Sequence, residues 1–138
     1  MVANRFDLTN QYAIEQGATY DRLSLFLPDN VANWTPYGQI RRDFAYRDEV
    51  AIALFGFQPL QYREVELQGE LVNRTIITPY LTDEQTLLLP VPKTRREGEE
   101  YKPGKNCWVY DFKIESNSGE VVKLQWGYVD VIPDVTRK

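Results

Sequence analysis

The strongest constraint on the fold is a pair of alternating segments in the last third of the chain. In each segment an apolar side chain recurs at every second residue, which is the spacing of a strand with one buried face. The apolar residues are Trp108, Tyr110, Phe112 and Ile114 in the first segment and Val122, Leu124, Trp126 and Tyr128 in the second. Turn residues at 116–119 separate them. The pattern predicts an antiparallel β-hairpin over residues 107–131 whose two apolar faces lie in the core.

The rest of the chain carries the same signal in shorter stretches. Gly69 interrupts one of these stretches, which predicts a bulge or a close backbone approach there. The charged residues 93–104, which include Pro and Gly, are predicted to form an exposed loop, followed at the chain end by a short tail at 133–138. We expect one all-β domain over residues 1–138, an antiparallel sandwich of about seven or eight strands. The further predicted strands cover residues 6–15, 23–27, 37–46, 64–71, 75–78 and 86–89.

Composition excludes several classes of function. The chain has 138 residues, of which 43% are hydrophobic, so an apolar core can form. Its net charge of −4 gives no attraction to phosphate backbones or anionic lipid, and we expect neither nucleic acid nor membrane as a partner. No stretch reaches the ~20 apolar residues of a membrane span, and the first residues lack the layout of a signal peptide. Synthesis in the cytoplasm is therefore expected.

The chain lacks histidine and has one cysteine, Cys107, so the usual zinc ligand sets and the Ser-His and Cys-His nucleophile systems cannot form. Paired carboxylates remain as a catalytic arrangement, but acidic residues seldom lie buried, and a solvated face explains these better. A carboxylate-dependent hydrolase would need two of them to converge in a cleft. We predict no catalytic residue, no metal and no cofactor. The acidic residues considered are Glu97, Glu99, Glu100, Asp111 and Glu115.

Aromatic side chains offer a second possibility, a stacking platform for a sugar or a base. The candidates are Trp34, Tyr37, Trp108, Trp126 and Tyr128. Trp108 and Trp126 fall in step with their apolar neighbours, which favours core packing for both. Trp34 and Tyr37 lie in a turn region, where a surface role stays open. A carbohydrate- or receptor-binding module is therefore the alternative interpretation.

Three segments carry a resemblance to known proteins: NRFDLTNQYAIEQGATYDRLSLF, WTPYGQIRRDF and CWVYDFKIESNSGEVVKLQWGYVDVIPDVTRK. They resemble small phage and prophage proteins, and are similar to the immunoglobulin-like amino-terminal domain of upper baseplate proteins. The shared motifs lie at residues 15–19, 39–41, 110–111, 127 and 133–137. Pro36 stands where those proteins have a glycine, and residues 93–104 are an insertion.

This resemblance implies an immunoglobulin-like sandwich that serves as a structural component of a tailed-phage particle. Such a module joins the baseplate to fibres or other tail proteins and needs no cofactor. It implies a location in the virion tail or baseplate, with assembly in the host cytoplasm. The implied partners are other tail, baseplate or fibre proteins and further copies of the same chain.

Candidate contact residues come from three segments. The run 50–57 is apolar on both sides of a strand, so both sides need cover, which a partner, the loop 93–104 or an end of the chain would supply. The charged loop and the end of the chain are the other two segments. The candidate residues are Val50, Ile52, Leu54, Phe55 and Phe57 in the run, Arg95 and Arg96 in the loop, and Val129, Val131 and Val135 at the end.

We expect folding to be independent of metal, because one cysteine without histidine cannot complete a ligand set. Thermal unfolding curves recorded with and without a chelator should superimpose. A lower midpoint in chelator would instead reveal an oxygen-ligated calcium site.

Overall fold

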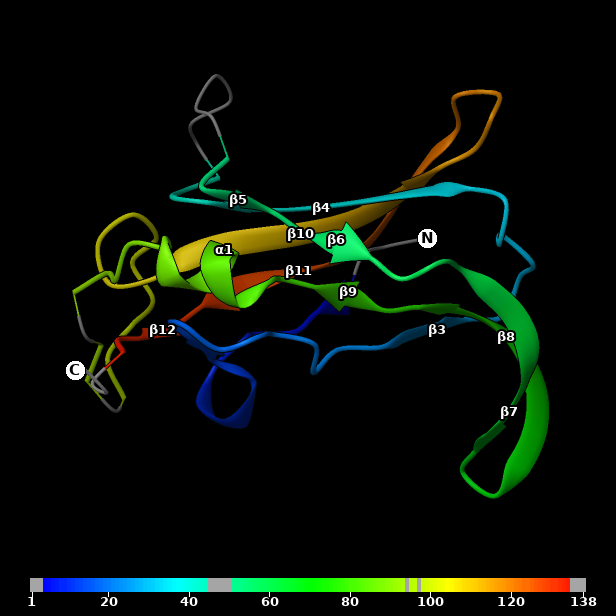
Figure 1. Ribbon diagram of the computed structural model, residues 1–138, viewed down its shortest axis with the longest axis horizontal. Helices are drawn as coiled ribbons and strands as arrows, with labels where there is room; N and C mark the ends of the chain where they lie inside the picture. The colour runs from blue at the N-terminus through cyan, green and yellow to red at the C-terminus, as the bar shows by residue number, and fades with distance from the viewer. Residues whose placement is uncertain (1–3, 45–50, 94, 97, 135–138) are drawn as a thin grey trace.

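The computed structural model describes residues 4–44, 51–93, 95–96 and 98–134 (Figure 1). Within these residues, several β-sheets pack over a shared hydrophobic core. The all-β sandwich predicted from the sequence is thereby confirmed.

The largest sheet in the described part of the chain has five strands, with β10 at its centre. In spatial order they are β1 (Asn4–Arg5), β11 (Val121–Val129), β10 (Trp108–Glu115), β4 (Thr35–Arg41) and β5 (Ala53–Leu54). β10 pairs antiparallel with both β11 and β4, whereas β1 runs parallel to β11 at an edge. The predicted hairpin over 107–131 is confirmed, and it forms the middle of this sheet.

Smaller sheets complete the sandwich, and in Figure 1 β9 and β3 run below the five-stranded sheet. Their strands are β3 (Leu25–Leu27) with β8 (Glu70–Ile77) and β7 (Gln61–Leu67), β6 (Gly56–Phe57) with β9 (Pro79–Tyr80), and β2 (Ile14–Glu15) with β12 (Val131–Ile132). A 3-10 helix spans Asn10–Tyr12 and the α-helix α1 spans Asp83–Leu87.

One side of β10 forms the centre of the core. The Phe112 ring lies edge-on to Phe55, with ring centroids 4.8 Å apart, and it also contacts Phe57 and Tyr110. Gly38 on β4 makes room for this ring, because a Cβ there would lie 2.5 Å from it. Trp108, Tyr110, Phe112 and Ile114 are all buried, as their spacing predicts.

A β-bulge in β11 overturns one part of the hairpin prediction. The pairing of β10 with β11 steps from Phe112↔Gln125 to Lys113↔Lys123, so Leu124 is an extra residue on β11. An extra residue reverses which side chains face the core. Leu124 is buried, but beyond it Trp126 and Tyr128 point to the outer face of the sheet. Their predicted place in the core was therefore wrong.

The apolar run 50–57 does not form one strand. In its described part, β5 pairs with β4 in the five-stranded sheet, and β6 pairs with β9 in another sheet. Phe55 lies at the crossing point and is buried between the layers. The run is apolar on both sides because it passes through the core from one sheet to the other. The side of the run that carries Leu54 stays exposed, so cover of that side by a partner remains a prediction.

The segment 64–71, predicted as one strand, contains a tight turn. Gln68 and Gly69 both adopt positive φ, 52° and 81°, as the two central residues of a type I′ hairpin turn do. β7 and β8 therefore run antiparallel on either side of this turn. Gly69 marks a chain reversal and no bulge.

A helix occupies part of the predicted strand 86–89. Thr82 accepts a hydrogen bond from the Gln85 N–H, and the Gln85 side chain accepts one from the Thr82 N–H. This reciprocal capping starts α1, and the spacing Thr-x-x-Gln is its sequence signature. The signal was present in the sequence, but the short apolar run that follows it hid the helix.

Substitutions on the two faces of the hairpin should destabilise the domain by different amounts. Phe112→Ala removes a buried ring and should cost about 3–5 kcal/mol, whereas Trp126→Ala on the outer face should cost about 1 kcal/mol. Midpoints of denaturant unfolding measure both. Equal losses of unfolding free energy in the two variants would place Trp126 in the core and contradict the bulge.

Candidate functional site

The structure divides the predicted contact residues into buried and accessible ones. Phe55, Val129 and Val131 are buried core residues, so they cannot meet a partner while the domain is folded. The prediction for these three is corrected, because burial inside the sandwich accounts for their apolar character. Leu54 is exposed, and Ile52 and Phe57 are half-buried. Val50 and Val135 lie outside the described residues.

A β-hairpin projects from the body of the described domain. We call residues 62–74, from β7 and β8, the arm. β3 pairs with β8 only at residues 75–77, so the arm extends beyond the sheet that anchors it (Figure 1). Within the described residues β7 pairs only with β8, so its outer edge is open. The sequence predicted the strands but gave no sign of this projection.

Side chains on the arm combine exposed apolar groups with charge. Leu71 is 67% exposed and Tyr62 is 40% exposed. Val65 pairs with Val72 across the two strands, and the next pair on that face sets Arg63 directly opposite Arg74. Two like charges opposite one another are unfavourable in isolation. A negatively charged partner group placed between Arg63 and Arg74 would relieve this repulsion.

A second accessible surface lies on the outer face of the five-stranded sheet. The bulge brings Trp126 and Tyr128 to this face, and Tyr101 stacks on Tyr128 with ring centroids 4.6 Å apart. The Arg5 guanidinium lies 4.9 to 5.9 Å from the centroids of these three rings, which is cation–π distance. Phe44, which is 47% exposed, contacts Trp126 edge-on. We call Tyr101, Trp126 and Tyr128 the aromatic cage, and the Arg5 side chain already occupies it.

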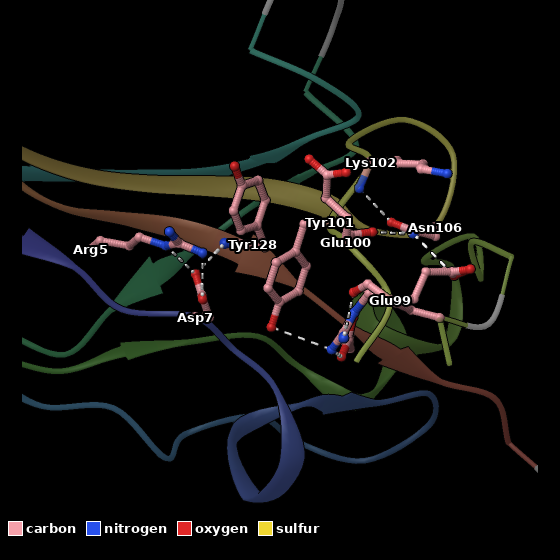
Figure 2. Close-up of polar contacts among 10 residues, drawn as sticks. Arg5, Asp7, Glu99, Glu100, Tyr101, Lys102, Asn106 and Tyr128 are labelled. Atoms are coloured by element: carbon pink, nitrogen blue, oxygen red, sulfur yellow. Dashed lines mark hydrogen bonds and ion pairs between the residues drawn. The ribbon is translucent and has the colours of Figure 1, made fainter. Parts of the chain in front are cut away.

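Ion pairs fix the segments around this cage (Figure 2). Arg5 pairs with Asp7 at 3.0 Å, and an Asp7 carboxylate oxygen accepts a hydrogen bond from the Tyr128 N–H. Arg95 pairs with Asp130 at 3.0 Å, and its guanidinium lies 4.1 Å from the Tyr101 ring centroid. These contacts attach the amino-terminal strand and the loop 93–104 to β11.

Asn106 organises the loop from within. Its side-chain oxygen accepts from the Lys102 N–H, and its amide group donates to the Glu100 carbonyl and the Glu99 carboxylate (Figure 2). Part of the loop is therefore docked on the body. Arg95, predicted to be a partner contact, instead holds the loop in place, while Arg96 is exposed.

Three of the titratable groups with raised pKa values, Tyr20, Cys107 and Tyr110, lie in the core. Burial raises the pKa of Tyr20 and of Tyr110, whose hydroxyls donate to the carbonyls of Tyr12 and Phe6. Burial also raises the pKa of the Cys107 thiol to about 11, so the thiol stays protonated at neutral pH. These three groups serve as hydrogen-bond donors or packing groups.

In the described part of the chain, no three Asp, Glu or Cys side chains gather where they could hold a metal ion. None of the helices described there is long and apolar enough to cross a membrane.

Comparisons with known proteins give no assignment. No protein-family model matches the chain, and no curated protein matches it. The resemblance to phage baseplate modules consequently depends on the sequence motifs alone.

Alkylation of Cys107 should report on loop docking. At pH 8 the native thiol should react slowly with iodoacetamide, because it is buried and its pKa is about 11. Arg95→Gln removes the ion pair with Asp130 and should speed the reaction roughly ten-fold by letting the loop open. The Arg95 charge lowers the pKa of Cys107, so its loss through electrostatics alone would slow the reaction.

The exposed neighbour supplies the control. Arg96→Gln makes the same charge change and should leave the alkylation rate unaltered. An unchanged or slower rate in Arg95→Gln would show that the ion pair does not hold the loop.

Proposed function

We propose that this chain is a non-enzymatic structural adaptor of a tailed-phage particle, joining the baseplate to fibres or other tail proteins. The motifs at 15–19, 39–41 and 133–137 support the phage context, and the all-β sandwich is the fold that the resemblance implies. The projecting arm is the observation that carries the adaptor role. Such an adaptor is synthesised in the host cytoplasm and resides in the virion tail.

The open edge of β7 suits strand addition. An isolated two-stranded hairpin is marginally stable in water, and a third strand along its edge would satisfy the free backbone groups. Tyr62 and Leu71 supply apolar area for the same contact. The arm therefore favours an extended segment of another protein as its partner.

The charges on β7 oppose pairing with a second copy. A two-fold axis between two antiparallel β7 strands that is centred on any of residues 63–66 sets two arginines or two glutamates directly opposite, and like charges directly opposite are unfavourable. Charged residues on an edge strand commonly prevent such self-association. We infer that the arm binds a different protein, and that any homo-oligomer uses another surface.

No group in the described part is assigned a catalytic role. The buried groups with a raised pKa, Tyr20, Cys107 and Tyr110, are held inside the core, two of them by hydrogen bonds to backbone carbonyls. A protonated thiol is a poor nucleophile, and a buried tyrosine with a raised pKa donates its proton reluctantly.

Carbohydrate binding is the second candidate. A hollow of about 220 Å³ beside Trp126 and Phe44 is also lined by Gln39, Asp111 and Lys123. Flat rings next to side chains that bond hydroxyl groups are typical of sugar sites. Binding on a glycan array that Trp126→Ala abolishes would favour this alternative over the adaptor.

An arm-shortened variant tests the adaptor. Residues 63–74 are replaced by an Asn-Gly turn, which keeps the core because the removed residues lie outside it. We expect the shortened chain to keep the β-type circular dichroism spectrum and a thermal unfolding midpoint within a few degrees of the parent. Mass spectrometry of gradient-purified particles should no longer detect the chain. Asn117→Ala with Ser118→Ala, in the exposed turn after β10, is the control and should still assemble.

The experiment distinguishes failure of the arm as the attachment element from failure of the adaptor function. If the shortened chain still enters particles, the arm is not the attachment element. If the intact chain is missing from purified particles, the adaptor function itself is wrong.

A further inference from the structure

A hollow of about 400 Å³ opens at the end of the sandwich where the arm begins. It lies between the connection from β3 to β4 and the β10–β11 hairpin, which Figure 1 shows at the same end of the molecule. Core residues Val31, Ile114 and Leu124 form part of its surface, so the hollow reaches the core itself. Its lining also includes Asp29, Trp34, Glu120 and Val122.

The wall that carries Asp29 is held in place by the base of the arm. The Thr75 hydroxyl on β8 donates to the Asp29 carbonyl at 2.7 Å and accepts from the Val31 N–H at 3.0 Å. Thr75 is fully buried, so these bonds are shielded from water. The hollow is therefore a preformed feature of the fold.

The charged side chains that line the hollow are all negative. Asp29 and Glu120 are exposed at the rim, and no lysine or arginine is among the lining residues. In the described residues neither carboxylate makes an ion pair or a side-chain hydrogen bond. An apolar interior below two uncompensated negative charges favours an occupant that is apolar along its length and positive at its tip.

Lysine and arginine side chains have this chemistry. Their methylene stems would cover Val122 and Ile114, while an arginine guanidinium would stack on the Trp34 indole within reach of the rim carboxylates. A sugar matches the hollow less well, because six of the lining residues are Leu, Val, Ile or Pro and leave its hydroxyl groups without partners.

We propose that this end hollow is a docking site for an arginine or lysine side chain presented by a partner protein. The inference depends on the proposed adaptor function only for the identity of that partner. Because Thr75 joins the hollow to the base of the arm, one partner can occupy both surfaces.

A peptide titration tests the site without the particle. The probe is acetyl-Leu-Arg-Leu-amide, added to the ¹⁵N-labelled full chain while the Trp34 indole signal is followed by NMR; Trp34→Phe assigns that signal. We expect a saturable shift that weakens as salt is raised. Acetyl-Leu-Gln-Leu-amide should bind roughly five-fold more weakly, since it lacks the positive charge.

Variants that replace acidic side chains by their amides separate the effect of the rim carboxylates from the effect of the protein's net charge. Asp29→Asn with Glu120→Gln should remove the preference for the arginine peptide. Glu66→Gln with Glu70→Gln, on the arm, makes the same change in net charge and should retain it. Both pairs replace exposed side chains, so thermal unfolding should stay close to that of the parent chain.

Each contrary result overturns the proposal. Equal binding of the two peptides, or no shift at Trp34, removes the basic side chain as occupant. A saturable Trp34 shift with maltotriose and none with the arginine peptide assigns the hollow to a sugar. A Trp34 shift that depends on protein concentration without peptide assigns it to a second copy. None of these results bears on assembly of the arm-shortened chain, so the two proposals fail independently.

Discussion

Burial of one side of β10 is the constraint on which the rest of the structure depends. Four large side chains on that side fill the space between the layers, and strands on both flanks must pair with β10 to satisfy its backbone. Gly38 on one flank yields room for the Phe112 ring. On the other flank Gly127 serves the amino-terminal segment, since a Cβ there would lie 2.2 Å from the Phe6 carbonyl oxygen. The first glycine is thus required by a ring that β10 buries, and the second by the segment that packs against β11.

The bulge at Leu124 separates the structural role of β11 from its surface role. Before the bulge the strand continues the core, and after it the strand contributes Val129 to the core and Trp126 and Tyr128 to the outer face. The aromatic cage around Arg5 exists only because of this reversal. One extra residue therefore converts part of a core strand into the attachment surface for the amino-terminal strand and the loop.

Sequence periodicity was sufficient for the fold class and for the central hairpin, because those depend on local alternation. Periodicity gave wrong predictions where contacts between distant segments determine which side chains are buried. The run 50–57 reads as a doubly covered strand, but its second cover is the other layer of the same molecule. The bulge leaves no mark in the alternation of Val122 to Tyr128, so Trp126 and Tyr128 were assigned to the core. The end hollow joins residues from the end of β3 and the β3–β4 connection with residues of the distant β10–β11 hairpin, and no single stretch of sequence could indicate it.

The two ends of the described chain pair in parallel. β1 runs beside β11 and β2 beside β12, with further backbone bonds from Phe6, Leu8 and Gln16 to the same carboxy-terminal segment. A tensile force applied between residues 4 and 134 would pull these parallel strands lengthwise past one another. Hydrogen bonds loaded in this shear direction must break together, whereas a peeled hairpin opens one bond at a time. The topology therefore gives the module mechanical resistance along the line that joins its two ends.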